Sequence, residues 1–402
     1  MNKRLAVLII WLSIICVATG CWNRRELNEV AIALALGLDK VEGGYAISVQ
    51  IVNPGEIAPK DRGGKGIPVQ TYTETGKTVF EALRRMTTKS PRKMLMSHLR
   101  VVIFGEELAR EGVKGTIDFL SRDHELRANF AILVSKGYSA ERILRVYTIP
   151  QEVIPGNKIY KSLEAVERSW AAAKKVTLDE LLEDLTKEGK QPSLTGVTLS
   201  GHSGPGNIET RENVEQIKMI TNIKLFQLAA FKGDKLIGWL TEEESKGYNY
   251  ILGHVNNSVG QIPCPNGGQL AMEVIRAKSS VKGAFRQGKP SIAVTIQLEE
   301  NIGDASCAID LTKTETIEEL EKRSEEVIRG YAASAVRKAQ KVFQSDILGF
   351  GSVLSKTDPQ AWKPYAKDWD REFRDLEVNI QVDAKIRRLG TTTNPIQVKG
   401  GE

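Results

Sequence analysis

Residues Ala31–Val52 have the sequence AIALALGLDKVEGGYAISVQIV, which predicts the first two strands of a β-sheet. Ala31–Asp39 is an apolar run of strand length, and Tyr45–Val52 alternates apolar and polar side chains. Glu42–Gly44 lies between them and supplies turn residues. Two strand patterns joined by a short glycine-containing turn are typical of a β-hairpin, so we expect the folded part of the chain to open with one.

Downstream of this hairpin, apolar runs of strand length alternate with segments of helical periodicity. Such alternation favours a layered α/β arrangement in which helices cover a sheet. The predicted elements are a helix over 78–87, a strand over 99–104, helical spacing over 106–120 broken at Gly112, a strand over 129–134, helices over 159–173 and 178–188, and a strand over 193–200.

A second region follows a segment rich in Gly, Pro and polar residues. It predicts strands over 217–231, 235–239, 269–277, 292–298 and 376–386. Thr241 with Glu244, and Thr316 with Glu319, match the capping box that begins a helix. The second of these helices is predicted to run to about Phe343 and to pack one face on the sheet. That face holds Ile317, Leu320, Val327, Tyr331, Ala335, Ala339 and Val342.

These patterns predict a mixed α/β (α+β) multi-domain fold with mixed or antiparallel sheets flanked by helices. The predicted limits are a signal peptide at 1–20, an N-terminal α/β region at 21–200 with an optional split near 148–160, a linker at 201–215, a C-terminal α/β domain at 216–393 and a tail at 394–402.

Composition excludes several classes of protein. The chain has 402 residues, of which 41% are hydrophobic and 26% charged, so neither long disorder nor a polytopic membrane protein fits. Lys and Arg number 56 against 50 Asp and Glu, and no long run of like charge occurs. We therefore expect no nucleic-acid partner.

The N-terminus has the pattern of an export signal. Lys3 and Arg4 precede the apolar run Leu5–Val17, which is too short to cross a bilayer comfortably. Gly20 then precedes Cys21, as at the cleavage site of a lipoprotein signal peptidase. We predict cleavage between them and an N-palmitoyl, S-diacylglycerol modification of Cys21. The alternatives are an ordinary cleaved signal or an uncleaved anchor helix.

Catalytic signatures are absent from the sequence. The four histidines, at 98, 124, 202 and 254, show no zinc-binding spacing, and neither a Gly-x-Ser-x-Gly elbow nor a complete phosphate-binding loop occurs. We expect no enzymatic activity, no metal and no cofactor. Cys264 and Cys307 are the remaining cysteines of the exported part. They could form one disulfide or stay as two separate buried thiols.

Four segments resemble one known family. They are CWNRRELNEVAIALALGLDK (21–40), SHLRVVIFGEELAREG (97–112), AAFKGDKLIGWLTEEESKG (229–247) and QSDILGFGSVL (344–354). Together they are similar to the Ger(x)C family, the C-subunit lipoproteins of spore germinant receptors. This resemblance implies a lipoprotein on the outer face of the spore inner membrane, working with membrane-embedded A and B subunits in nutrient-triggered germination.

Two hypotheses about function follow. The first is a lipid-anchored accessory subunit that acts through contacts with the A and B subunits. The second is a lipid-anchored extracytoplasmic solute-binding protein. For the first, Gly238–Glu244 and the Gly349–Gly351 turn are candidate contact surfaces, although core packing is the favoured interpretation of Trp239. Core packing is likewise favoured for Trp362 and Trp369.

Overall fold

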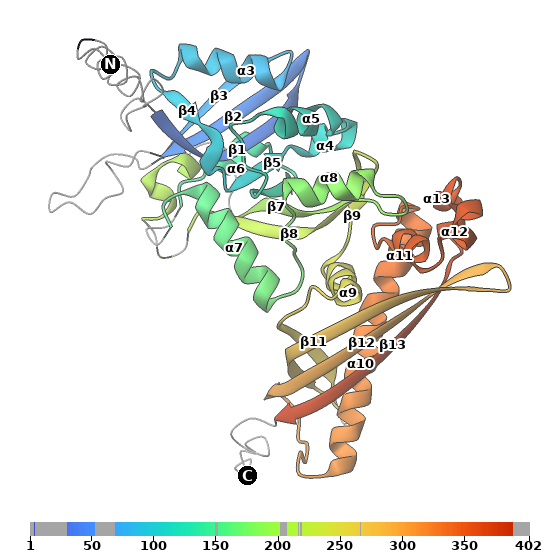
Figure 1. Cartoon of the computed structure of the whole chain (residues 1–402). Coiled ribbons are helices and arrows are strands. Elements are labelled where there is room, and N and C mark those ends of the chain that lie inside the picture. Colours follow the sequence, from blue (N-terminus) through green and yellow to red (C-terminus); the bar gives the residue numbers. More distant parts are fainter. Residues whose placement is uncertain are drawn as a thin grey trace, which may run out of the picture.

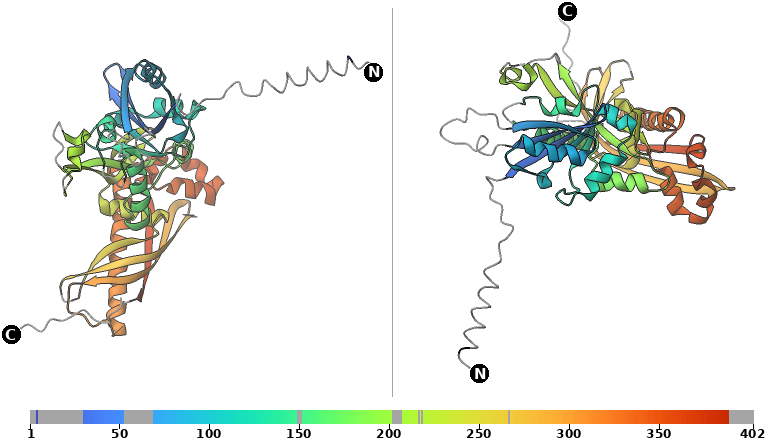
Figure 2. Two further views of the ribbon diagram at one scale, coloured as in Figure 1. Left: turned by 90° about the vertical axis from the view of Figure 1, so that its left-hand side faces the viewer. Right: turned by 90° about the horizontal axis from the view of Figure 1, so that it is seen from above.

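The computed structural model describes residues Arg4, 30–52, 69–148, 152–201, 207–215, 217, 219–265 and 267–388. In these ranges the chain forms two β-sheets, which lie in two lobes arranged end to end (Figure 1). The left view of Figure 2 shows the same separation of the lobes along the long axis. Helices accompany both sheets, so the predicted mixed α/β, multi-domain fold class is confirmed.

The larger sheet has the strand order β3-β2-β1-β5-β6-β7-β8-β9, and β4 also pairs with β1. Its central strands β1, β5, β6 and β7 run parallel, whereas both flanks are antiparallel. Parallel strands are covered on both faces, which explains why β5 and β6 are fully buried. The strands span β1 Val30–Val41, β2 Gly44–Val52, β3 Val69–Gly76, β4 Lys93–Leu95, β5 Val101–Phe104, β6 Ala131–Ser135, β7 Ser193–Gly201, β8 Thr221–Lys232 and β9 Lys235–Trp239.

The predicted opening hairpin is confirmed. β1 and β2 pair antiparallel, and Val41 opposite Gly44 leaves Glu42 and Gly43 as a two-residue turn. Gly43 has a φ of 76°, which glycine adopts without the steric penalty that a Cβ would add. This turn therefore needs glycine for its conformation.

Helices cover both faces of the larger sheet. One face carries α3, α4, α5 and α8, which share a core with Leu36, Val102 and Phe104 of the sheet. The other face carries α6 and α7, which pack on Val101 and Ile103. The helices span α3 Val79–Arg85, α4 Glu106–Glu111, α5 Lys114–Arg122, α6 Ala140–Leu144, α7 Pro155–Ser169 and α8 Leu178–Thr186.

The prediction of 201–215 as a linker assumed that this polar segment separates two domains. In the structure it joins two strands of one sheet. β7 and β8 on either side of it pair antiparallel, and β9 extends the same sheet to Trp239. The strands before and after this segment, which the limits 21–200 and 216–393 assign to different domains, therefore belong to one sheet. A Gly- and Pro-containing segment indicates a connection but not whether its flanking strands pair. Likewise α6, which precedes 148–160, and α7, which begins inside that range at Pro155, share one core.

The smaller sheet has the order β10-β11-β12-β13. β11 and β12 form a long antiparallel hairpin, and β13 runs parallel to β12. Both hairpin strands are about twice as long as predicted. The parts outside the predicted ranges contain few large apolar residues, so their sequence lacks the alternation that indicates a strand. The elements of this lobe span α9 Glu242–Leu252, β10 Ser258–Pro263, β11 Gln269–Arg286, β12 Lys289–Ala305, α10 Thr314–Arg337 and β13 Glu377–Arg388.

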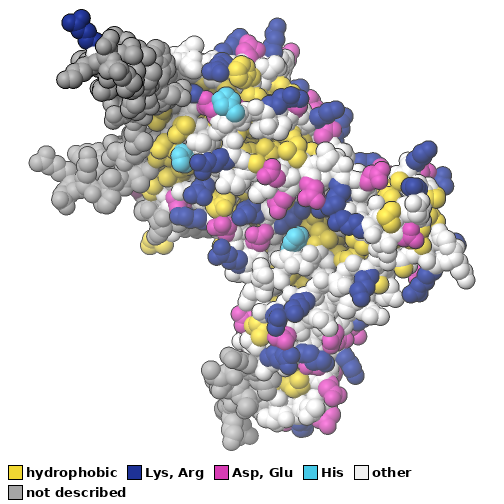
Figure 3. All heavy atoms as spheres, in the orientation of Figure 1, with side chains coloured by type: hydrophobic (Ala, Val, Ile, Leu, Met, Phe, Trp, Pro, Cys, Tyr) yellow, Lys and Arg dark blue, Asp and Glu magenta, His cyan; other side chains and the backbone are white. Residues whose placement is uncertain are grey.

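α9 and α10 cover one face of the smaller sheet and bury Ile292, Val294 and Ile296 of β12. The residues between them on β12 point the other way and are exposed. Polar and charged side chains accordingly dominate the face of this lobe that Figure 3 shows. The predicted capping box of α9 is confirmed, because the Glu244 N–H donates to Thr241 Oγ1 (3.2 Å) and the Thr241 N–H donates to Glu244 Oε2 (2.7 Å).

α10 confirms the predicted long helix but not its start. The helix begins at Thr314, after Lys313, whose side chain makes no capping hydrogen bond. Thr316 therefore lies inside the first turn, and the capping box predicted for Thr316 and Glu319 is wrong. The end also differs, because the chain passes into a π-helical turn over Lys338–Phe343.

The π turn changes which residues face the core. Ala335 and Ala339 of the predicted face are buried, but Val342 is 62% exposed. A π turn holds more residues than an α-helical turn, so side chains beyond it leave the helical phase. Sequence periodicity assumes one constant period and could not show this shift.

Three short helices follow α10 and connect the lobes. They span α11 Phe350–Thr357, α12 Pro359–Ala366 and α13 Trp369–Phe373. Trp362 and Trp369 are buried and their rings meet edge-on at 4.8 Å, which confirms the core interpretation of both. The backbone of α11 lies against the loop before β7, where the Ser352 N–H donates to the Gly189 carbonyl (3.0 Å).

Candidate functional site

The residues of the predicted lipid site, Gly20 and Cys21, lie outside the described residues, as do Trp22 to Glu29. In the ranges that the structure describes, no helix is long and apolar enough to cross a membrane. No group of three or more His, Cys, Asp or Glu side chains in those ranges could hold a metal ion.

Cys264 and Cys307 are joined by a disulfide in the structure, with their Cα atoms 6.5 Å apart. The bond ties the turn after β10 to the segment that follows β12. Both cysteines pack in a small apolar cluster with Leu270 and Ile302. Of the two arrangements that the sequence left open, the structure has the paired one.

Each of the two contact surfaces considered from the sequence has a residue that is engaged within the molecule. The Trp239 indole N–H donates to Glu106 Oε1 (3.2 Å), and its ring meets Phe226 edge-on. A Cβ at Gly351 would lie 2.6 Å from the Trp369 indole nitrogen, so this glycine permits a close internal contact. Trp239 and Gly351 are therefore used within the molecule, whereas Glu242 and Glu243 of the first surface remain exposed.

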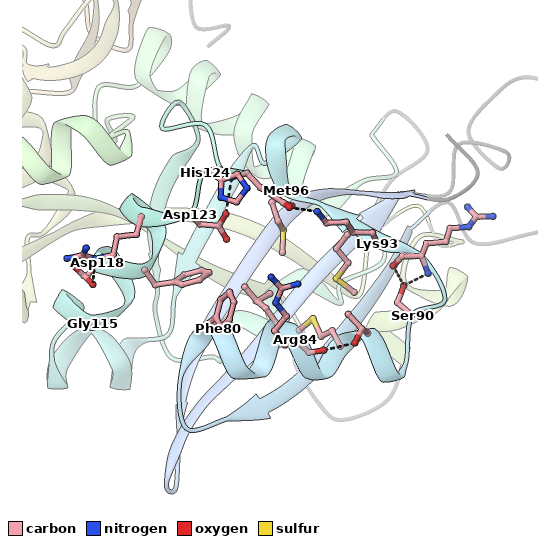
Figure 4. A pocket seen from close by; sticks show the side chains of 17 residues that line it. Phe80, Arg84, Ser90, Lys93, Met96, Gly115, Asp118, Asp123 and His124 are labelled. Carbon is pink, nitrogen blue, oxygen red and sulfur yellow. Dashed lines mark hydrogen bonds and ion pairs between the residues drawn. The ribbon is translucent and has the colours of Figure 1, made fainter. Parts of the chain in front are cut away.

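A groove of about 400 Å³ opens in the larger lobe between α3 and α5 (Figure 4). Its floor is formed by β4 and by the 3₁₀ turn Met96–His98, and the loop Asp123–Glu125 closes one side. The volume lies in the range of clefts that hold organic ligands, roughly 300–1,000 Å³.

The groove lies where the N-terminal segment joins the sheet. β4 pairs in parallel with the first residues of β1, and Lys93 lies opposite Val30. Only residues 22–29 separate Val30 from Cys21. A fully extended chain of this length spans about 30 Å, so the groove lies close to the predicted lipid site.

The sequence of α3 presents one side of the helix to the groove. Thr78 caps this helix, since its hydroxyl accepts the Glu81 N–H (3.1 Å). Val79 and Ala82 face the core. Side chains three and four residues apart share a helix face, so Phe80, Leu83, Arg84 and Thr87 together line the groove.

The groove has an apolar lining. Met86 and Met96 are buried in its floor, and Met94 lies partly buried between them and solvent. Phe80 is 52% exposed and its ring lies 6.3 Å from that of Phe119. Methionine is flexible and polarizable, so such a floor can adapt to apolar groups of different shape.

The rim carries charges of both signs, but only some are paired. Arg122 forms a salt bridge with Asp118 (2.9 Å) and holds the pKa of this carboxyl below its usual value. Lys93 pairs with Glu125. The Arg84 guanidinium lies 4.8 Å from the centre of the Phe80 ring.

Within the described ranges, no salt bridge involves Arg84 or Arg92. Figure 4 shows Phe80 and Arg84 on one wall of the groove and Asp123 and His124 on the opposite wall. The arrangement can bind a group that is apolar on one side and anionic on the other, because it combines apolar walls with unpaired guanidinium groups.

A second cavity of about 440 Å³ lies at the carboxyl ends of β1, β5 and β6. There Asp39 accepts the N–H groups of Ala140 (2.8 Å) and Glu141 (3.0 Å) at the start of α6. Burial raises the pKa of Asp39, and these two hydrogen bonds oppose the rise. Glu106 lines the same cavity, and its carboxylate accepts hydrogen bonds from the side chains of Arg110 and Trp239. These carboxylates therefore hold neighbouring elements together.

The groove could not be predicted from the sequence, although the sequence carries one signal of it. Residues 82–105 contain six Lys or Arg and no Asp or Glu. The sequence shows this excess of basic residues. Only the packing of α3 against α5 shows that some of them surround an apolar groove.

Comparisons with known proteins agree with the fold and with the quoted motifs. The family described as "Spore germination protein N-terminal domain" matches residues 23–199, and "Spore germination B3/ GerAC like, C-terminal" matches residues 227–390. Spore germination protein KC of Bacillus subtilis (strain 168) is 28% identical over 404 residues, covering 98% of each chain. Spore germination protein A3 of the same organism is 25% identical over 380 residues, covering 93% of this chain and 95% of the relative.

A solved structure has the same fold. The structure titled "Crystal Structure of the GerBC protein" aligns with a TM-score of 0.54 and 17% identity, covering 87% of this chain and 96% of that one. The two family matches span both lobes in order, and the relatives match over almost their whole length. This chain therefore belongs to the Ger(x)C family of spore germination proteins.

Proposed function

We propose that this chain is the lipid-anchored C subunit of a nutrient germinant receptor, needed for spore germination through contacts with membrane-embedded A and B subunits. The observation that carries this proposal is the match of both family models, in order, across the two lobes. Full-length similarity to several proteins named for spore germination supports the same role.

The anchor is proposed from the N-terminal sequence. The signal peptide is cleaved after Gly20, and Cys21 carries S-diacylglycerol and N-palmitoyl chains. More than one acyl chain is needed for stable anchoring, since a single myristoyl chain gives only marginal binding. The mature chain of residues 21–402 then lies on the outer face of the cell membrane and, in the spore, of the inner membrane.

The proposed role is non-enzymatic. The buried carboxylates that we describe, such as Asp39 and Asp346, accept backbone N–H groups from neighbouring helices. Their hydrogen bonds are thus used to hold elements in place. This use is consistent with a subunit that acts through contacts.

The Cys21→Ala variant tests the proposal in the native organism. We expect the unmodified chain to leave the membrane fraction and nutrient-triggered germination to slow at least tenfold, because the anchor holds the subunit beside its partners. Mass spectrometry of the N-terminal peptide of the wild-type chain should show the acylated cysteine. Normal germination of the variant, or an unmodified Cys21 in the wild type, would contradict the proposal.

Co-purification tests the partners. Detergent extracts of spore membranes should yield the A and B subunits with a tagged wild-type chain. A deletion strain should lose nutrient-triggered germination but retain the response to a nutrient-independent trigger. Loss of both responses would place the chain outside the receptor.

The solute-binding alternative has less support. The groove between α3 and α5 has the volume of a ligand cleft, but the relatives reported above, which match over almost their whole length, are named for spore germination. We therefore do not propose this function.

A further inference from the structure

We propose that the groove between α3 and α5 docks on an anionic membrane surface, with lipid phosphates at Arg84 and Arg92 and acyl chains against its apolar lining. This inference rests on the lipid anchor of the proposed function and deepens it. It names the lipid surface as the occupant of the groove and assigns the larger lobe a second point of membrane contact.

The reach of the N-terminal segment supports this occupant. With Cys21 at the membrane, Val30 lies at most about 30 Å from the surface, because eight residues intervene. The floor of the groove is built on β4, and Lys93 of β4 is the register partner of Val30. The groove is therefore among the parts of the molecule that the tether holds nearest to the lipid.

The charge of the surrounding surface suits anionic headgroups. The segment from Arg84 to Lys93 carries five Lys or Arg and no acidic residue. Arg85 pairs with Glu81 and Lys89 pairs with Glu74, and in both pairs the basic side chain is more than half exposed. Exposed pairs are weak and exchange readily for a new anion, so these cations can add to the attraction of Arg84 and Arg92.

The apolar part of the site is presented toward solvent. Phe80 is 52% exposed although it lies on a helix whose other face is core. Its ring lies between the Arg84 guanidinium and the Phe119 ring. An aromatic ring beside cations is the arrangement found at the headgroup level of membranes.

A weak contact is sufficient for a tethered lobe. A tether of a few residues gives an effective concentration in the millimolar range. Docking with a dissociation constant of this order then holds the lobe against the bilayer for much of the time. Docking would also fix which faces of the molecule point toward membrane-embedded partners.

Flotation of the mature chain with vesicles tests the inference without the anchor. The chain carries Cys21→Ser, so that no acyl group contributes. We expect at least fivefold more chain to float with phosphatidylglycerol vesicles than with phosphatidylcholine vesicles, at lipid concentrations of up to about 10 mM. Added salt should abolish the difference, since the attraction is electrostatic.

Two variants and two controls locate the contact. Arg84→Ala with Arg92→Ala should lower binding about 25-fold, at about fivefold for each cation. Phe80→Ser should lower it severalfold with unchanged thermal stability, because the side chain is half exposed. The charge-matched control Arg329→Ala with Arg337→Ala, on exposed positions of α10, should leave binding unchanged. Val342→Ser, at an apolar side chain that is 62% exposed, is the matched control for Phe80.

Equal binding to both lipids, no binding to either, or equal loss in the controls would each overturn the inference. Binding that appears only when a membrane protein is added would identify a protein as the occupant instead. The vesicle experiment and the Cys21→Ala experiment can fail separately. Failure of germination without the anchor, together with no vesicle binding, would leave the receptor role standing and remove the docking surface.

Discussion

At the scale of single residues, Asp346 shows how a buried charge organises a connection. Its carboxylate accepts three donors, the Phe350 N–H (3.1 Å), the Gly351 N–H (2.8 Å) and the Trp369 indole N–H (2.9 Å). Burial raises the pKa of Asp346 to about 6, and these hydrogen bonds oppose the rise. The side chain thus joins the start of α11 to α13 at a cost in desolvation.

Asp346→Asn should destabilise the protein by about 1–3 kcal/mol at pH 7, since an amide offers one acceptor where the carboxylate offers two oxygens. The pKa of Asp346 is higher in the folded state than its usual value of 3.8. Its contribution to stability is therefore fully present below pH 3.8 and is lost as the pH rises through about 6.

Urea unfolding at two pH values measures this effect. The stability difference between the wild type and Asp346→Asn should be about 1 kcal/mol larger at pH 5 than at pH 7. Asp304→Asn, at an exposed position, is the matched control and should show no such change. A difference that is the same at both pH values, or that shrinks toward pH 5, would show that burial does not raise the pKa of Asp346.

At the scale of elements, the disulfide closes the base of the small sheet. Cys264 follows β10 and Cys307 follows β12, and the bond encloses the β11–β12 hairpin. The sequence separation of the two cysteines is 43 residues. Closing a loop of this size restricts the unfolded chain, for which the expected stabilisation is roughly 2–4 kcal/mol.

Cys264→Ser combined with Cys307→Ser should lower the free energy of unfolding by that amount. The apolar cluster around Leu270 and Ile302 remains, so the variant should still fold. The wild type in the presence of a reductant should unfold at the same urea concentration as the variant. Maleimide labelling of the unfolded, unreduced wild type at both cysteines would contradict the pairing.

At the scale of the whole molecule, backbone packing at α11 is one of the contacts that join the two lobes. Gly351 and Gly189 approach so closely that a Cβ on Gly351 would lie 2.7 Å from the Gly189 Cα. The Trp362 indole N–H donates to Glu188 Oε2 (3.3 Å) beside this contact. The close approach at Gly351 therefore adds to the apolar core that Leu228 and Ala230 of β8 share with Tyr248 of α9 in placing the lobes.

Gly351→Ala should destabilise the protein by about 1–3 kcal/mol, because the added methyl group overlaps backbone and the Trp369 indole. Calorimetry should show the single unfolding transition broaden or split as the lobes uncouple. Gly330→Ala is the matched control on α10, where a Cβ meets nothing within 4 Å. It should stabilise the helix by up to about 1 kcal/mol. Equal effects of both changes would show that the contact does not couple the lobes.

The sequence by itself determined the features that depend on near neighbours. The turn at Glu42 and Gly43, the capping box of Thr241 and Glu244 and the long helix α10 all follow from interactions within a few residues. The family was also recognisable, because its motifs are short and ordered along the chain. Such patterns survive without knowledge of the packing.

Tertiary structure alone decided the features that depend on distant segments. Pairing of β7 with β8 across 201–215, the exposure of Val342 in the π turn and the groove between α3 and α5 each depend on how elements are placed relative to one another. Apolar periodicity shows that one face of an element is buried. It does not show which other element packs on that face. Those choices are made by the packing of the whole core, which is why the groove was found only in the folded molecule.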